Sequence, residues 1–96
     1  MRKKIEFLDR LFKVLHCRND ILEYLKVQKL IDDNTMQALL HEQHTTHSTR
    51  IAGLLEGLVA EERVQLVSYE WTVLPKELMK LTIVTDTDKK EFVYSV

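Results

Sequence analysis

The sequence predicts an α+β domain in which N-terminal helices precede a small antiparallel β-sheet. Apolar residues recur at helical spacing as far as Leu58, and β-branched and aromatic residues dominate from Val64 onward. With 96 residues, 45% of them apolar, the chain is long enough for one core. The single proline, Pro75, leaves no Pro-rich linker. We therefore expect one domain over residues 1–96.

The first expected helix covers residues 3–16. Its apolar positions are Ile5, Phe7, Leu8, Leu11, Phe12, Val14 and Leu15. Together they form a stripe wider than one packing partner would cover. Residues 1–18 also hold six basic and two acidic residues. We therefore expect a basic N-terminal helix that forms a homodimer interface through Leu8, Leu11, Phe12 and Leu15.

The second and third helices are predicted from capping signals. Asp20 and Glu23 have the spacing of a capping box, which favours a helix over about residues 20–31. Asp33 or Asn34 is then expected to cap a short third helix. Its inward positions are Met36, Leu39 and Leu40.

A fourth helix and three strands complete the expected domain. Thr46 or Ser48 is expected to cap a helix, because the polar stretch HTTHS interrupts the apolar pattern. The apolar positions of this helix are Ile51, Leu54, Leu55 and Leu58. The segments VQLVSYEWTV, KLTIVT and EFVYSV favour strands, and the polar TDTDKK favours a hairpin connection between the last two.

Residues 36–67 carry an apolar residue, a polar turn with a capping residue, an apolar ladder and a valine before the first strand. These positions are Leu40, Thr46, Ile51, Leu54, Leu58 and Val64. The pattern resembles the winged helix-turn-helix family of the antibiotic-resistance-repressor and arsenic-repressor kind. It departs from that family at His44, usually a small or apolar packing residue, and at Glu62, usually a glycine.

The resemblance implies a helix-turn-helix over 32–62, with strands and a wing over 63–96. It further implies a small DNA-binding transcriptional regulator that acts as a homodimer on double-stranded DNA. Arg50 would pair with guanine, Thr49 with a thymine methyl, and His47 or Ser48 with phosphate. The other implied DNA-binding residues are Gly53 on the same helix, Lys76 and Lys80 at the wing, and Arg2, Lys3 and Lys4 in an N-terminal arm.

The charge distribution leaves an alternative open. The net charge is −1, and residues 19–62 hold three basic against eight acidic residues, which would repel phosphates. Tyr69, Trp71 and Val73 alternate along the first expected strand and could form a partner surface. The alternative is a non-catalytic winged-helix module that binds protein and not DNA.

The histidines and the cysteine are the remaining candidates for chemistry. His41, His44 and His47 would lie near one helix face only if the helix continued through Thr46, which leaves a metal site as a minor alternative. HEQH lacks the zinc-protease spacing, and Cys17 has no identifiable catalytic partner. We expect no enzyme activity and no cofactor. A lone cysteine and the lack of a signal-peptide core or apolar span favour a cytoplasmic protein that does not bind membranes.

Overall fold

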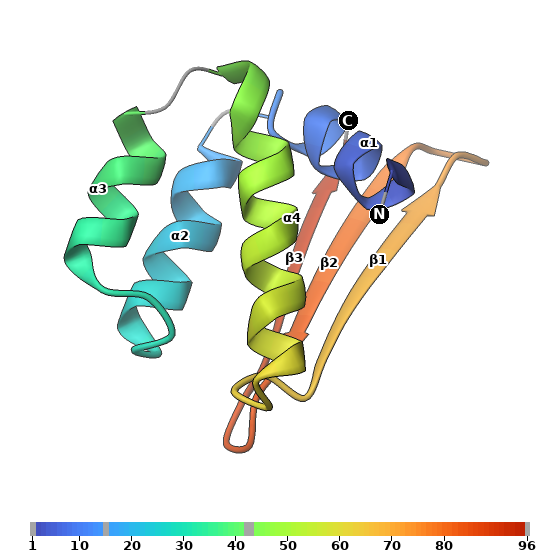
Figure 1. Cartoon of the computed structure of the whole chain (residues 1–96). Coiled ribbons are helices and arrows are strands. Elements are labelled where there is room, and N and C mark those ends of the chain that lie inside the picture. The colour runs from blue at the N-terminus through green and yellow to red at the C-terminus, as the bar shows by residue number, and fades with distance from the viewer. Residues whose placement is uncertain (1, 15, 42–43, 96) are drawn as a thin grey trace.

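Four helices precede three strands, so the predicted α+β class is confirmed (Figure 1). The computed structural model describes residues 2–14, 16–41 and 44–95, with side chains from residue 47 onward in the last range. The helices are α1 (Arg2–Leu11), α2 (Cys17–Val27), α3 (Asp33–His41) and α4 (His44–Ala60). The strands are β1 (Leu66–Thr72), β2 (Leu78–Val84) and β3 (Lys89–Ser95).

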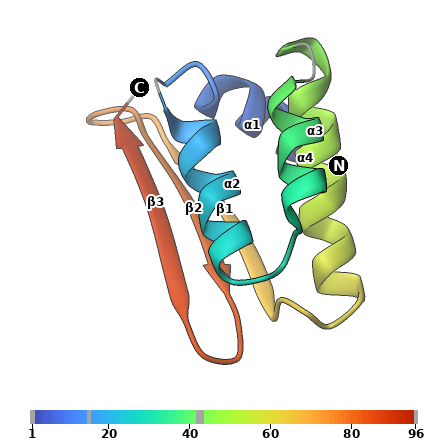
Figure 2. The same ribbon diagram turned by 90° about the vertical axis from the view of Figure 1, so that its left-hand side faces the viewer.

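The three strands form an antiparallel sheet in the order β1-β2-β3, with the helices on one of its faces (Figures 1 and 2). Tyr69 pairs with Leu81, which pairs with Phe92, so one row of side chains crosses all three strands. Within the described chain, β1 and β3 are both edge strands, and no helix covers the second face of the sheet (Figure 2). The fold is therefore two layers, with one sheet face open.

The core lies between the helices and one face of β2. Met79, Leu81 and Ile83 alternate along β2 and have no exposed surface. Successive side chains of a strand point to opposite faces, so these three share the face that the helices cover. The fully buried helical side chains in the same core are Leu8, Leu11, Cys17, Ile21, Leu22, Leu25, Ile51, Ala52 and Leu55.

Helix boundaries differ from the sequence prediction at every helix. α1 ends at Leu11 and not at residue 16, and α2 ends at Val27 and not near residue 31. α2 begins at Cys17, after His16 with φ of 68°, and not near residue 20. The oxygen that caps α3 belongs to Asp32, whose Oδ1 accepts a 2.7 Å hydrogen bond from the Thr35 amide. α4 begins at His44 and runs unbroken to Ala60. Capping residues mark where a helix can start, but packing decides where it does.

The apolar stripe of α1 packs against other elements of the same chain. α1 contacts both α4 and β1, and Leu8 and Leu11 have no exposed surface. Phe12 is partly buried against the same core, while Leu15 lies outside the described residues. The width of the stripe is explained by two partners inside one protomer. Leu8 and Leu11 are thus core residues, and an interface built on them would require α1 to move.

α4 ends in a left-handed residue that is not glycine. Glu62, singled out in the sequence as standing where a glycine is usual, has φ of 61°. The Arg63 amide donates to the Leu58 carbonyl at 2.9 Å, and the Glu62 amide donates to the Val59 carbonyl at 3.0 Å. This is the Schellman pattern, in which the left-handed position favours glycine. Glu62 therefore keeps the turn at a steric cost.

None of the described helices is long and apolar enough to cross a bilayer.

Leu8→Ala should lower the free energy of unfolding by about 2 to 5 kcal/mol, the cost of truncating a buried leucine. Urea denaturation followed by circular dichroism measures this. Lys3→Ala, on the exposed side of the same helix, should change it by less than about 0.5 kcal/mol. If Leu8→Ala instead leaves stability intact and only dissociates a dimer, Leu8 belongs to an interface.

Glu62→Gly should raise the free energy of unfolding by about 1 kcal/mol, because glycine adopts the left-handed conformation without steric cost. Ala60→Gly, in the last helical residue, is the matched control and should be destabilising by about 0.5 to 1 kcal/mol. The two urea midpoints should move in opposite directions. A loss of stability in both variants would mean that residue 62 is not left-handed in solution.

Candidate interaction surface

The DNA-contact residues expected on the fourth helix divide between core and surface. His47 and Ser48 are each 2% exposed, whereas Thr49, Arg50 and Gly53 are exposed. The helical period explains the division, because His47, Ser48, Ile51, Ala52 and Leu55 lie on the face of α4 that packs inward. His47 and Ser48 therefore belong to the packing of the domain.

His47 joins α4 to α2. The Nη1 of Arg18 lies 2.6 Å from His47 Nδ1, and since a guanidinium is always protonated, Arg18 is the donor. His41 lies on α3, where its Nδ1 donates to the Gln37 carbonyl at 2.7 Å. The side chain of His44 falls outside the described residues. His41 and His47 are thus on different helices, and the described side chains form no cluster of three or more metal ligands.

The N-terminal basic residues differ in whether a carboxylate of the chain pairs with them. Lys4 forms an ion pair with Glu56 of α4, and its Nζ lies 5.5 Å from the centroid of the Tyr69 ring. Lys4 therefore ties α1 to α4 and β1. Arg2 is exposed and lies 3.4 Å from Glu6. Lys3 is exposed and makes no ion pair with any residue that the structure describes.

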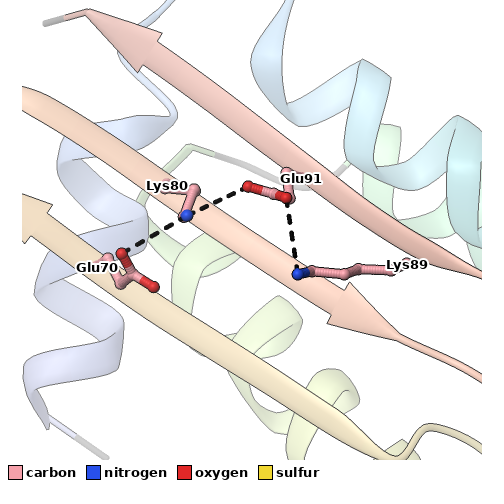
Figure 3. Close-up of polar contacts among 4 residues, drawn as sticks. All are labelled: Glu70, Lys80, Lys89 and Glu91. Carbon is pink, nitrogen blue, oxygen red and sulfur yellow. Dashed lines mark ion pairs between the residues drawn. The ribbon is translucent and has the colours of Figure 1, made fainter.

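Lys80 lies in the middle of the sheet face that carries no helix (Figure 3). Its Nζ is 3.2 Å from Glu91 and 3.7 Å from Glu70, which sit on the two flanking strands. Glu91 also lies 3.9 Å from Lys89. The hydrogen bond to Glu91 and the charge of Glu70 raise the pKa of Lys80. Its charge is therefore already matched by two carboxylates.

The cations expected to contact DNA do not share one surface. Lys80 points away from the helix layer, whereas Arg50 lies on α4 within that layer. Lys76 is exposed in the β1–β2 connection, which projects beyond α1 (Figure 1). One DNA duplex could not contact Arg50 and Lys80 together without wrapping around the sheet.

A groove lies between the start of α1 and β1. It has a volume of about 490 Å³ and is lined by Lys3, Lys4, Glu6, Phe7, Tyr69 and Trp71; we call it the α1–β1 groove. Phe7 meets Tyr69 edge-on, with centroids 5.5 Å apart and an interplanar angle of 84°, and meets Trp71 at 6.3 Å and 83°. Such edge-to-face pairs fix the orientation of the rings. The groove therefore has an ordered aromatic floor and a charged rim.

Burial keeps the floor of this groove uncharged. Desolvation, followed by the charge of Glu56, raises the pKa of Tyr69. Its hydroxyl is enclosed and has no hydrogen-bond partner among the described residues. The floor of the groove is therefore aromatic and uncharged.

The β1–β2 connection continues this apolar surface. Val73 is 60% exposed and Leu74 is 80% exposed, while Trp71 and Leu78 on the adjoining strand ends are 43% and 38% exposed. We call these four residues the apolar tip. Large apolar side chains that gather at one end of a small domain mark an interaction site more often than isolated ones do. The tip and the α1–β1 groove share Trp71, whereas Leu78 lies on the face of β2 that carries no helix.

The sequence indicated part of this surface. Tyr69 and Trp71 do share the helix-facing side of β1, but Val73 lies beyond the end of that strand. Phe7, Leu74 and Leu78 were not singled out as surface residues. The signal for Leu74 was present, since an exposed turn around the only proline rarely needs an apolar pair such as Val73-Leu74. Phe7 had no such signal, because its partners are more than 60 residues away.

Cys17 is buried at the start of α2. Burial raises the pKa of its thiol to about 12, so at neutral pH it is a protonated packing group.

Comparisons with protein-family models, curated proteins and solved structures gave no match to this chain.

Cys17 should resist alkylation in the folded protein. Its thiolate fraction at pH 8 should fall by roughly two to three orders of magnitude below that of a free thiol, since its raised pKa keeps the proton on sulfur below pH 11. Iodoacetamide labelling followed by mass spectrometry should be slow in buffer and fast in 8 M urea as a denaturing control. Equal rates in both conditions would mean that Cys17 is exposed.

Proposed function

We propose that this chain is a non-catalytic protein-interaction module that docks a partner on the apolar tip and the α1–β1 groove. The observation that carries the proposal is the gathering of Trp71, Val73, Leu74 and Leu78 at one exposed end, beside an aromatic groove. Tryptophan and tyrosine are enriched among residues that dominate binding energy at protein interfaces. A partner that covers this surface would remove exposed apolar side chains from water, among them Trp71 and Leu74.

The placement of charge supports a protein partner over a nucleic acid. Lys4 and Lys80 are each neutralised by carboxylates of this chain, and a phosphate contact would have to replace those ion pairs. DNA affinity depends on several unpaired cations on one surface. The helix that would enter the groove of DNA is α4. It belongs to segment 19–62, in which acidic residues outnumber basic ones. These features favour the protein-binding form of the domain.

The winged-helix DNA-binding regulator, which the sequence resemblance implied ahead of the protein-binding module, is the second candidate. The order of elements, with α3 and α4 followed by a hairpin, is compatible with it. Thr49, Arg50 and Gly53 are exposed on α4, and Lys76 is exposed at the hairpin. Homodimerisation likewise stays a prediction, without Leu8 and Leu11 as interface residues.

A selection from a random peptide library on the immobilised full chain tests the proposal. Trp71 is the only tryptophan, so its fluorescence reports directly on the surface in question. Selected peptides should change this fluorescence, and Leu74→Ser should weaken their binding about tenfold or more, as loss of a central apolar contact does. Val27→Ser is the matched control, because Val27 is 65% exposed at the end of α2 and should leave binding unchanged.

Heparin retention and gel shifts with double-stranded DNA separate the two candidates. Passage through heparin at low salt is expected for the protein-binding module. Retention that is lost only at high salt, and that Arg50→Ala and Lys76→Ala both weaken, would favour the DNA-binding regulator. Peptide binding that Leu74→Ser and Val27→Ser reduce equally would contradict the docking surface.

A further inference from the structure

We infer that the partner is an extended segment that adds to the free edge of β1 as a fourth strand, with alternating apolar residues and acidic residues at one end. The inference rests on the proposed function and specifies its binding mode. An edge strand presents unpaired backbone amide and carbonyl groups, which a partner strand can satisfy.

The two sheet edges differ in how they are protected. β3 reads KKEFVYS and carries three charged residues, whereas β1 reads LVSYEWT and carries only Glu70. Charged side chains and short strands are the usual means of blocking unwanted pairing at an edge. β1 has seven residues, four of which (Val67, Tyr69, Trp71 and Thr72) have high strand preference, and its one charge points to the open face toward Lys80. β1 is therefore the edge strand with less protection against pairing with another strand.

The α1–β1 groove runs beside this edge. Tyr69 and Trp71 occupy alternate positions of β1 on the helix-facing side, and Phe7 of α1 contacts both rings. A strand added to β1 would project every second side chain toward the same side. Those side chains would lie over the aromatic floor, so the segment needs apolar residues at alternate positions.

The rim of the groove favours acidic residues. Arg2 and Lys4 in the first turn of α1 are paired with Glu6 and Glu56, so the positive potential comes from Lys3 and from the partial charge of the helix N-terminus. Lys3 lines the groove and makes no ion pair with the described residues, and Glu6 is the only acidic lining residue. A carboxylate at the end of the segment near Trp71 would complement this potential.

The groove beside β3 has the opposite character. Its lining includes Asp20 and Glu23 of α2, and Asp20 accepts a hydrogen bond from the Tyr94 hydroxyl at 3.2 Å. An acidic segment would be repelled there. The β3 groove therefore provides an internal control for the charge preference.

Aromatic and basic residues together also suit single-stranded nucleic acid, but the geometry favours a peptide. Stacking on bases requires accessible ring faces. Tyr69 meets Phe7 edge-on and is partly buried, which leaves Trp71 as the more exposed ring of the groove floor. The free strand edge has no role in binding a nucleic acid but a direct one in binding a peptide.

Two synthetic peptides test the inference against the full chain. The first has valine at four alternate positions, threonine between them and two glutamates at one end; the second has lysines in place of the glutamates. Trp71 fluorescence should show the glutamate peptide binding about fivefold or more tightly, the ratio expected when exposed ion pairs form rather than repel. Lys3→Glu should reverse this preference, whereas Lys90→Glu at the β3 groove should not.

Amide hydrogen exchange by NMR on the bound complex distinguishes strand addition from docking alone. Amides of β1 that point away from β2 should exchange at least tenfold more slowly with peptide, and β3 amides should be unchanged. Library binders that need Leu74 but leave the β1 amides unprotected would overturn the inference and keep the proposed function. Protected β1 amides in a peptide-free dimer, or tighter binding of oligo-dT than of either peptide, would also overturn it.

Discussion

Burial of one face of β2 is the constraint on which the structure depends. Met79, Leu81 and Ile83 can leave water only if helices cover that side of the sheet, and α1, α2 and α4 supply the cover. A chain of 96 residues has enough helix for one face. The second face stays in contact with solvent, and it is stabilised by the ion pairs around Lys80 in place of an apolar layer.

The same constraint determines what is left exposed. The helix layer covers the middle of the sheet, but the connection between β1 and β2 extends beyond α1 (Figure 1). Val73 and Leu74 therefore have no helix to pack against, and Trp71 is covered only in part by Phe7. The candidate interaction surface arises where apolar sequence continues past the end of the core.

Ion pairs within the fold bear on whether the domain suits a nucleic acid or a protein partner. Lys4 lies between Glu56 and the Tyr69 ring, so a basic residue of the N-terminal segment serves to hold α1 against α4 and β1. Lys80 is shared by two carboxylates on neighbouring strands. Each pair lowers the positive potential that a nucleic acid would meet, while Lys3 remains at the rim of the groove.

The sequence by itself determined the order of helices and strands, the interior positions of Leu55 and Leu58, and the switch to strands after Val64, because periodicity is a local property. It also indicated Tyr69 and Trp71 as a shared strand face. Only the tertiary structure decided that Leu8 packs inside the protomer, that His47 is enclosed beside Arg18, and that Lys80 faces away from Arg50. Each of these depends on which distant element covers a side chain, and periodicity carries no information about that partner.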